Sequence, residues 1–542
     1  MTIPDPDLTA ASDAIEVAAS VVGSGVATLT AGGGPDSNQV LAYDLAHAAA
    51  QVAAARALLD YGGKGAIEAR LTCAFAADMV HDLISRTSGR ESVWGIATAA
   101  LDSAHPFLEK FRSPEFVASL AQSPGPRHLD DQMTMVADTF RGFADKVIKP
   151  HAERVHRENA DVPEEIVQGL AEMGAFGLSV PVEYGGFSEG GSNEYIAMVV
   201  ATEELSRGSL GIGGSLITRP EILTRALLNG GTENQKAEWL PKLATAEVMP
   251  AVAVTEPDYG SDVANLKVTA TAAEGPNGEP GYAINGVKTW CTFGARADVL
   301  ALLARTDRDT AKAHRGLSLF IVPKPRGEGH AFAFSQPARA DGIVGTLEGR
   351  AIDTIGYRGM HSYEVSLVDW WVPASNLIGE ADGVGKGFGM QMAGFENGRL
   401  QTAARAVGVM QAAYEAAIDY ARNRKVFGAP IADYQLTQVK LGRMVVLIQA
   451  GRQFAYHVAR LMADNAGARG GTAEAAMVKA YVCKAAEWVT REAMQIHGGM
   501  GYAEEFVVSR LFVDARVLSI FEGADETLCL KVIARRLCES AS

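Results

Sequence analysis

The sequence predicts a mainly α-helical protein with a smaller β domain in its middle, and the hydrophobic period carries this prediction. Up to about residue 246, apolar residues recur at the three- and four-residue spacing of helices. Between about residues 250 and 375, the period falls to two, as in strands. From about residue 385 onward the helical period returns. We therefore expect a helical extension at 1–125, a helical domain at 129–246, a middle β domain at 247–378 and a C-terminal helical domain at 379–542.

The first 125 residues are rich in Ala and helical in rhythm. The Tyr-Gly-Gly at 61–63 ends one predicted helix. This stripe is too apolar to stay in solvent, so we expect residues 35–120 to form helices packed on the rest of the protein. "QSPGPRH" (122–128) is typical of a linker. The apolar face of the predicted helix consists of Leu41, Leu45, Ala48, Val52, Ala55 and Leu59.

Strand-like segments fill the middle of the chain, and a further helix follows them. The strand candidates are "LKVTATA", "GYAING", "DVLALLART", "LSLFIVP" and "YEVSLVDWWVP", with hairpin signals at "PNGEPG" and "INGV". The segment 323–345 is expected to be a surface insertion in the β domain. Near the C-terminus, a helix is expected to end at "HGGMG" (497–501). Its apolar stripe is Val478, Val482, Ala485, Val489 and Ala493.

Composition and charge exclude several classes of partner. The formal net charge of −15 argues against nucleic acid or an anionic membrane as the main partner. The five scattered cysteines form no CxxC pair, so neither a disulfide framework nor a metal site is indicated. The first twenty residues are acidic and interrupted by prolines, unlike a secretory or mitochondrial leader. No run reaches the roughly 18 apolar residues of a membrane-spanning helix. We expect a cytoplasmic protein.

Four separated segments occur in a distinctive order: "VAVTEPDYGSD" (252–262), "KTWCTFG" (288–294), "RNRKVFGAPIADYQ" (422–435) and "QIHGGMGYAEEF…FEGADET" (495–527). Through them the chain resembles the acyl-CoA dehydrogenases over about residues 130–540. The resemblance implies a helical domain, a small β-barrel-like domain and a C-terminal helical bundle around one FAD. It also implies α,β-dehydrogenation of an acyl-CoA, electron-transfer flavoprotein as acceptor, and a homo-oligomer built as a dimer of dimers.

The stretch "SIFEGADETL" (519–528) joins two predicted helices and carries the candidate base. A thioester α-carbon is a poor acid, so its proton must be removed by a positioned base. The resemblance places this base at Glu522, in "FEG". Some members of the family carry the base on an earlier helix, immediately before an Arg. The matching position here is Gly398, which cannot act as a base, and Glu396 should face elsewhere.

The resemblance implies that several segments contact FAD. Trp290 and Thr292 would cover the ring and its N5 atom, with β-domain core as the alternative for Trp290. Arg424 and Gln435 would reach the FAD of a neighbouring subunit, with a surface ion pair as the alternative for Arg424. For Glu526 and its neighbour Asp525, a solvated rim and a contact with FAD both stay open. The residues implied to contact FAD are Val252, Val254, Thr255, Ser261, Trp290, Thr292, Arg424, Phe427, Gln435, Gln495, Gly498, Gly499, Ala524 and Glu526.

Ala524 stands where relatives commonly have a Thr whose hydroxyl touches FAD, so that contact is missing or replaced. Gly501 would also let the backbone approach the cofactor, although glycines at a helix end are often only C-caps.

Through the extension, its length and "SLITRPEILTR" (215–225), the chain resembles members of the family that act on a short, α-branched acyl group ending in a carboxylate. Because an isolated carboxylate is costly to bury, it needs a paired cation, and Arg219 is the candidate. A surface position is the alternative for Arg219. Another short- or branched-chain acyl-CoA dehydrogenase and an acyl-CoA oxidase are competing readings. A flavin-bearing relative that binds DNA is disfavoured by the acidic charge. The residues implied to contact the substrate are Ser261, Arg219, Phe395, Arg399 and Gly523.

Overall fold

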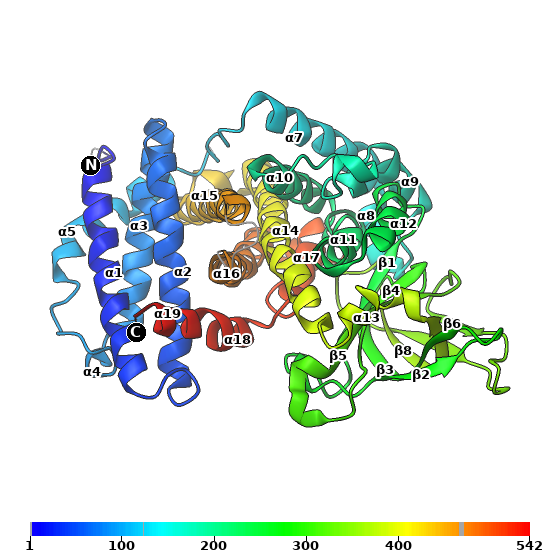
Figure 1. The fold of residues 1–542 in the computed structure, drawn as a ribbon. Helices are drawn as coiled ribbons and strands as arrows, with labels where there is room; N and C mark the ends of the chain where they lie inside the picture. The colour runs from blue at the N-terminus through cyan, green and yellow to red at the C-terminus, as the bar shows by residue number, and fades with distance from the viewer. Residues whose placement is uncertain (1–2, 123, 465–470, 542) are drawn as a thin grey trace. The chain divides into compact units, whose positions relative to one another are not determined.

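The computed structural model describes residues 3–122, 124–464 and 471–541. The chain forms two compact units. The first unit consists of Met1–Arg141, Gly191–Gly208 and Arg399–Ser542, and the second of Gly142–Gly190 and Ser209–Gly398. The first unit is mainly helical, and the second combines helices with a larger β-sheet (Figure 1).

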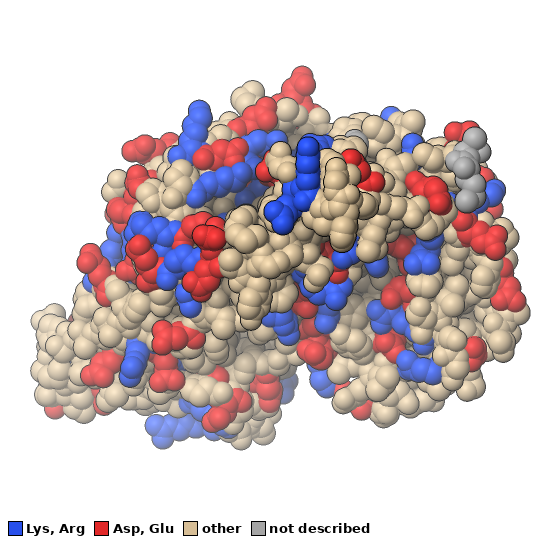
Figure 2. All heavy atoms as spheres, turned by 180° about the vertical axis from the view of Figure 1, so that it is seen from behind, with Lys and Arg blue, Asp and Glu red and all other residues tan. Residues whose placement is uncertain are grey.

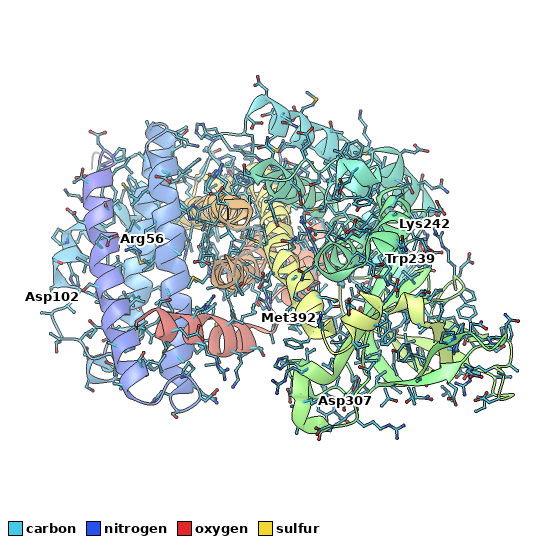
Figure 3. All side chains as sticks on the ribbon, viewed as in Figure 1. Arg56, Asp102, Trp239, Lys242, Asp307 and Met392 are labelled. Carbon is cyan, nitrogen blue, oxygen red and sulfur yellow. The ribbon has the colours of Figure 1, made fainter. Side chains whose placement is uncertain are left out.

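The N-terminal extension is a layer of helices in which α1 (Leu8–Ala31), α2 (Gln39–Gly62) and α3 (Ala66–Thr87) lie side by side (Figure 1). Helix α2 also packs on α15 (Gln435–Asp464) and α16 (Thr472–Ile496). It ends at Gly62, as predicted, and its predicted face is buried from Leu41 to Ala55. On the surface, Arg56 of α2 pairs with Glu16 of α1 at 2.9 Å (Figure 3). The expectation that the extension packs on the rest of the protein is confirmed, and the C-terminal helices α15 and α16 provide the contact.

Helix α1 is long and apolar enough to cross a membrane by length and composition, with a mean hydropathy of 1.5. The expectation that no segment would qualify was therefore wrong. It considered uninterrupted apolar runs, whereas the small residues between the apolar residues of α1 lower its mean hydropathy only a little. In the structure α1 packs against α2, α3 and α19 (Ala534–Ala541), and Ile15 and Leu29 are fully buried. In its most apolar 18-residue window, 44% of the residues are buried, so α1 buries one face against these neighbours.

The remaining elements of the first unit complete the helical body. The predicted stripe of α16 is buried, and the helix ends at Ile496, next to the predicted glycines. Helix α14 belongs to the second unit up to Gly398 and to the first from Arg399 onward. The other helices are α4 (Glu91–Trp94), α5 (His105–Phe111), α6 (Pro114–Ala118), α7 (Asp131–Phe143), α10 (Ser192–Gly208), α14 (Gly387–Asn423), α17 (Val507–Val517) and α18 (Asp525–Thr527).

The linker after the extension is pinned to the helices around it. The Arg127 guanidinium pairs with Glu204 at 2.6 Å and with Glu203 at 3.1 Å, and both carboxylates are buried. Tyr61 donates a hydrogen bond from its hydroxyl to the carbonyl of Pro126 (3.0 Å). Removing one partner of a buried ion pair leaves the other charge buried and uncompensated, which costs free energy. These contacts therefore fix the path of the described part of the linker.

The second unit places helices beside a mixed sheet. Among the described residues, eight strands form this sheet in the order β1-β4-β2-β3-β8-β7-β6, with β5 pairing on β4. Strands β1 and β4 are parallel. The strands are β1 (Pro250–Ala253), β2 (Thr269–Glu274), β3 (Pro280–Thr292), β4 (Val299–Arg305), β5 (Leu317–Pro323), β6 (Ala331–Ser335), β7 (Thr346–Ile352) and β8 (Ser362–Pro373). The helices are α8 (Lys149–Glu158), α9 (Glu164–Glu172), α11 (Thr218–Gly230), α12 (Glu233–Ala244) and α13 (Glu380–Gly383).

The core of the second unit lies where α11 and α12 meet the apolar face of β4 and β5. Trp239 of α12 is buried there, and the ammonium of Lys242 covers its ring at 5.2 Å from the centroid (Figure 3). The core side chains include Leu223, Leu227, Leu240, Leu243, Leu303, Leu319 and Ile321.

The structure tests the two predicted hairpin turns of the sheet and the segment 323–345. "PNGEPG" forms the hairpin turn between β2 and β3, as predicted, but "INGV" is no hairpin turn. It is a bulge inside β3, where Gly286 has φ +135° and the ladder to β8 shifts register. The segment 323–345 contains the edge strand β6, which pairs antiparallel with β7.

Basic and acidic side chains are interspersed on the face that Figure 2 shows, without a continuous basic stripe.

Deleting residues 1–125 is expected to give aggregated protein, because it uncovers the apolar faces of α15 and α16 on which α2 packs. Size-exclusion chromatography and calorimetry would measure the effect. Deleting residues 1–6 is the matched control, since it leaves Asp7, the N-cap of α1, in place. A monodisperse 1–125 deletion with an unchanged Tm would contradict this prediction.

Candidate active site

Glu522 lies in the turn between α17 and α18 and has a strained backbone. Its φ is +55°, in the left-handed region that non-glycine residues rarely occupy. Such a conformation costs about 1–3 kcal/mol and persists only where the surroundings enforce it. Gly523 follows with φ +99°, and a Cβ there would lie 2.8 Å from Leu528. The turn thus holds a half-buried carboxylate in one fixed conformation.

Cationic side chains surround this turn within the first unit. The fully buried Lys479 of α16 donates a hydrogen bond from Nζ to the carbonyl of Gly523 at 2.6 Å. Burial lowers the pKa of Lys479, while the charges of Asp525 and Glu522 oppose that change. The guanidinium of the buried Arg405 lies 5.4 Å from the ring centroid of Phe521. Cationic side chains of α14 and α16 thus brace the turn.

The other acidic side chains of the turn have different surroundings. Glu526 is exposed, and Ala524 is the N-cap of α18 without a side-chain hydrogen bond. Asp525 is buried, and its carboxylate meets Tyr43, His47 and Lys484. Sequence reasoning left a solvated rim open for Asp525, and this was wrong because the carboxylate binds the extension.

The glycines after α16 leave open space at the end of that helix. A Cβ at Gly498 or Gly499 would meet nothing within 4 Å, and Gln495 is exposed beside them. Gly501 differs, since a Cβ there would lie 2.2 Å from the carbonyl oxygen of Met494. Packing therefore explains Gly501. Gly498 and Gly499 offer bare backbone for the close approach of a ligand.

In the second unit, a buried ion pair braces the turn that carries Thr255. Glu256 accepts hydrogen bonds from the backbone N–H groups of Lys267 (2.7 Å) and Val268 (2.9 Å) and from Lys288 Nζ (2.9 Å). Burial lowers the pKa of Lys288, and the charge of Glu256 opposes this effect. The sequence analysis missed this pair, although Glu256 and Lys288 each lie inside one of the recognised motifs. The available signal was the charge of Lys288 within a strand-like stretch.

Trp290 projects from a bulge in β3 with 54% of its surface exposed. Its φ of +56° turns the side chain away from the strand's normal alternation. The alternative that Trp290 is core is therefore wrong. Thr292 is buried nearby in the same strand, with its hydroxyl 3.0 Å from that of Ser362. An exposed, fixed indole can stack on a planar ligand.

The remaining predicted positions of the second unit vary in exposure. Val254 belongs to the core, and its carbonyl accepts a hydrogen bond from Lys288, while Val252 and Phe395 pack against the same core. Contacts of the two valines with a ligand would therefore use the backbone. Ser261 is exposed. Arg219, near the start of α11, is 5% exposed, so a surface position for it was wrong.

A small hairpin of the first unit, with strands β9 (Lys425–Val426) and β10 (Ala429–Pro430), carries the next predicted residues. Phe427 at its tip is 96% exposed. Arg424 is exposed too. Gln435 instead donates a hydrogen bond to Glu115 of the extension (3.3 Å). Arg399 of the first unit is 9% exposed.

Three family models match the chain: acyl-CoA dehydrogenase N-terminal domain at residues 130–247, middle domain at 251–369 and C-terminal domain at 385–538. The chain belongs to the acyl-CoA dehydrogenase family. Its fold is the acyl-CoA dehydrogenase fold with an N-terminal extension, as predicted.

A curated relative is the (2S)-methylsuccinyl-CoA dehydrogenase of Cereibacter sphaeroides, 43% identical over 77% of this chain and 71% of the relative. Among solved structures, a glutaryl-CoA dehydrogenase in complex with glutaryl-CoA is 32% identical, with a TM-score of 0.64 over 75% of this chain and 95% of that one. A glutaryl-CoA dehydrogenase from Mycobacterium smegmatis in complex with FADH₂ is 26% identical, with a TM-score of 0.64 over 76% and 96% of the two chains.

As an acyl-CoA dehydrogenase, the protein is an FAD-dependent oxidoreductase that acts on the CH–CH group of an acyl-CoA. The residues of each unit fit such a cofactor. The second unit offers the exposed indole of Trp290, and the first unit offers the bare backbone of Gly498 and Gly499.

Proposed function

We propose that the protein oxidises (2S)-methylsuccinyl-CoA to mesaconyl-CoA, a step of the ethylmalonyl-CoA pathway, with Glu522 as the base. The strained Glu522 carries the proposal, because a positive φ at a half-buried carboxylate is maintained only by specific contacts. The 43% identity with a methylsuccinyl-CoA dehydrogenase supports the choice of substrate.

In the proposed reaction, the Glu522 carboxylate takes the proton from the α-carbon of the thioester. FAD, when bound, supplies the acceptor for the hydride that leaves the β-carbon. The electron pair of the broken α-C–H bond then forms the double bond. Trp290 would orient the acceptor by stacking, and Thr292 would lie at its N5 atom. Arg399 would bind the nucleotide of CoA, and electron-transfer flavoprotein would reoxidise the enzyme.

Arg219 is the proposed partner of the substrate's carboxylate, because it is a buried cation near the start of a helix. The N-terminal end of α11 adds a favourable potential for an anion. The other Arg of this helix, Arg225, lies 3.5 Å from Glu221, which also accepts a hydrogen bond from Asn397 (3.2 Å). Arg219 lies in the first turn of α11, nearer than Arg225 to the helix N-terminus, and is therefore the better candidate for a substrate anion.

A panel of CoA esters tests the proposal against the competing members of the family. The purified protein should be assayed anaerobically with methylsuccinyl-, succinyl-, isobutyryl- and glutaryl-CoA, with a dye or electron-transfer flavoprotein as acceptor. We expect the highest kcat/KM on methylsuccinyl-CoA. A preference for isobutyryl- or glutaryl-CoA would replace the proposed substrate, and turnover only in the presence of oxygen would indicate an oxidase.

We also propose that Arg424 and Phe427 reach the FAD of a second copy of the chain, so that the enzyme is a homo-oligomer. A 96% exposed Phe at a hairpin tip is typical of an interface, and an exposed guanidinium can bind a pyrophosphate with its planar fork. The same proposal includes the pairing of two such dimers into a dimer of dimers.

Arg424→Ala is therefore expected to lower the FAD retained through gel filtration, because one anchor of the cofactor is lost. The ratio of flavin to protein absorbance measures this. Arg422→Ala is the matched control, since Arg422 bonds to Gln122 within the first unit. A monomeric wild type with full flavin content would rule out the shared site.

A further inference from the structure

The segment that follows Glu522 is bound to the N-terminal extension. The hydroxyl of Tyr43 on α2 donates a hydrogen bond to Asp525 Oδ2 at 2.5 Å, and Nε2 of His47 lies 3.2 Å from the same oxygen. Tyr43 and His47 are one helical turn apart and meet edge to face, with ring centroids 4.7 Å apart. Helix α2 thus holds a carboxylate three residues from the proposed base.

Asp525 is anionic in this environment. Burial raises its pKa, but the hydrogen bonds and charge of His47, the hydroxyl of Tyr43 and the charge of Lys484 outweigh that effect. The net result is a pKa below the usual value for Asp. Lys484 Nζ lies 3.4 Å from the same oxygen. Charge-assisted hydrogen bonds of this kind are stronger than neutral ones.

In the part of the chain that the structure describes, His47, Asp525 and Cys529 form a group compact enough to hold a metal ion. Two observations favour a hydrogen-bonded cluster instead. Asp525 Oδ2 is already shared by a hydroxyl, an imidazole and an ammonium group, which a cation would have to displace. Burial also raises the pKa of the Cys529 thiol, so the thiolate that a metal binds is disfavoured.

The turn of Glu522 is therefore anchored at two points directly after the strained position. Lys479 of α16 holds the carbonyl of Gly523, and α2 of the extension holds the side chain of Asp525. The backbone N–H of Asp525 also donates to the carbonyl of Ser519 (3.1 Å), which closes the turn around Glu522. Loosening Asp525 would release the segment that keeps Glu522 at positive φ.

We propose that Tyr43 and His47 are positioning residues for Glu522, which they act on by clamping Asp525. The proposal rests on the assignment of Glu522 as the base. It gives the extension a part in catalysis although the extension lies outside the matched family models, which begin at residue 130.

Tyr43→Phe in the full-length holoenzyme is the decisive variant, because it removes one hydroxyl and keeps the ring. Tyr61→Phe is its matched control: it removes a hydroxyl from the same helix, where the bond is to Pro126 and not to the turn. The measurements are kcat and KM on the best CoA ester, and hydrogen–deuterium exchange of the segment 519–527. A second variant, Asp525→Asn, removes the charge while keeping the shape.

We expect Tyr43→Phe and Asp525→Asn to lower kcat about tenfold or more, since small displacements of a reacting group reduce the rate strongly. KM should stay within about twofold of the wild type, because the CoA contacts are unchanged. Exchange in 519–527 should accelerate in both variants and stay at the wild-type rate in Tyr61→Phe.

Wild-type kcat and wild-type exchange in Tyr43→Phe would overturn the proposal. So would equal losses in Tyr43→Phe and Tyr61→Phe, which would mark a merely structural role. If Glu522 is not the base, the outcome is different. The Glu522→Gln enzyme would then remain active, whatever the rate of hydrogen–deuterium exchange in residues 519–527.

Discussion

Replacing Glu522 with Gln is expected to lower the rate of substrate oxidation by about 10²–10⁴-fold, the usual contribution of a positioned base. Gln has the shape of Glu but cannot take up a proton at neutral pH. The fold and the bound flavin should remain, since the anchors of the turn are Lys479 and Asp525. Stopped-flow measurement of flavin reduction under anaerobic conditions isolates the chemical step.

Glu504→Gln is a suitable control for this experiment. Glu504 is an exposed carboxylate in the same unit, and we expect its replacement to leave the reduction rate unchanged. A Glu522→Gln enzyme that is reduced at a near-normal rate would remove Glu522 from the chemistry.

Arg219→Leu should reduce kcat/KM on methylsuccinyl-CoA far more than on the uncharged 2-methylbutyryl-CoA. Leaving one partner of a buried charge pair alone costs about 3–5 kcal/mol. At about 1.4 kcal/mol per factor of ten, this is roughly two to three and a half decades. Part of the loss should appear in kcat, because the carboxylate is next to the carbon that releases hydride and its clamp fixes the geometry of transfer. Arg219→Lys should recover only part of the activity, since an ammonium lacks the planar fork.

Arg225→Leu separates a general effect on α11 from a specific one. Its guanidinium faces Glu221, so its loss should affect both esters alike. If Arg219→Leu also impaired both esters equally, Arg219 would be structural, and another cation would hold the carboxylate or the substrate would be a different one.

Much of the fold could be predicted from local patterns in the sequence, and the features that could not be predicted have physical causes. The stripes of α2 and α16 and the glycines at their ends were predictable because helix period and helix termination are local properties. The same reading understated α2, in which Ala42, Ala46 and Ala54 are also fully buried. Helix α2 keeps only a narrow solvent face, around Arg56 and Asp60, so its sequence pattern shows little of what covers its other sides. The bulge at Gly286 was mistaken for a turn because Asn-Gly favours both conformations.

In the candidate site, too, some features could be predicted from the sequence and others could not. The turn between helices that carries Glu522 could be predicted from sequence, because helix ends are marked locally. The partners of Asp525 could not, since Tyr43 and His47 are 482 and 478 residues away in the chain. The exposure of Trp290 was also beyond local pattern, because the bulge that turns it outward depends on the register with β8.

The pinned linker has a consequence for experiments at low enzyme concentration. Arg127 ties the end of the extension to Glu203 and Glu204 of the same chain, so the contact between α2 and Asp525 is intramolecular. Dilution does not weaken an intramolecular contact, whereas a contact supplied by a second copy disappears below its dissociation constant. In a dilution series, the contribution proposed for Arg424 would fade with falling protein concentration, while that of Tyr43 and His47 would persist to the most dilute sample.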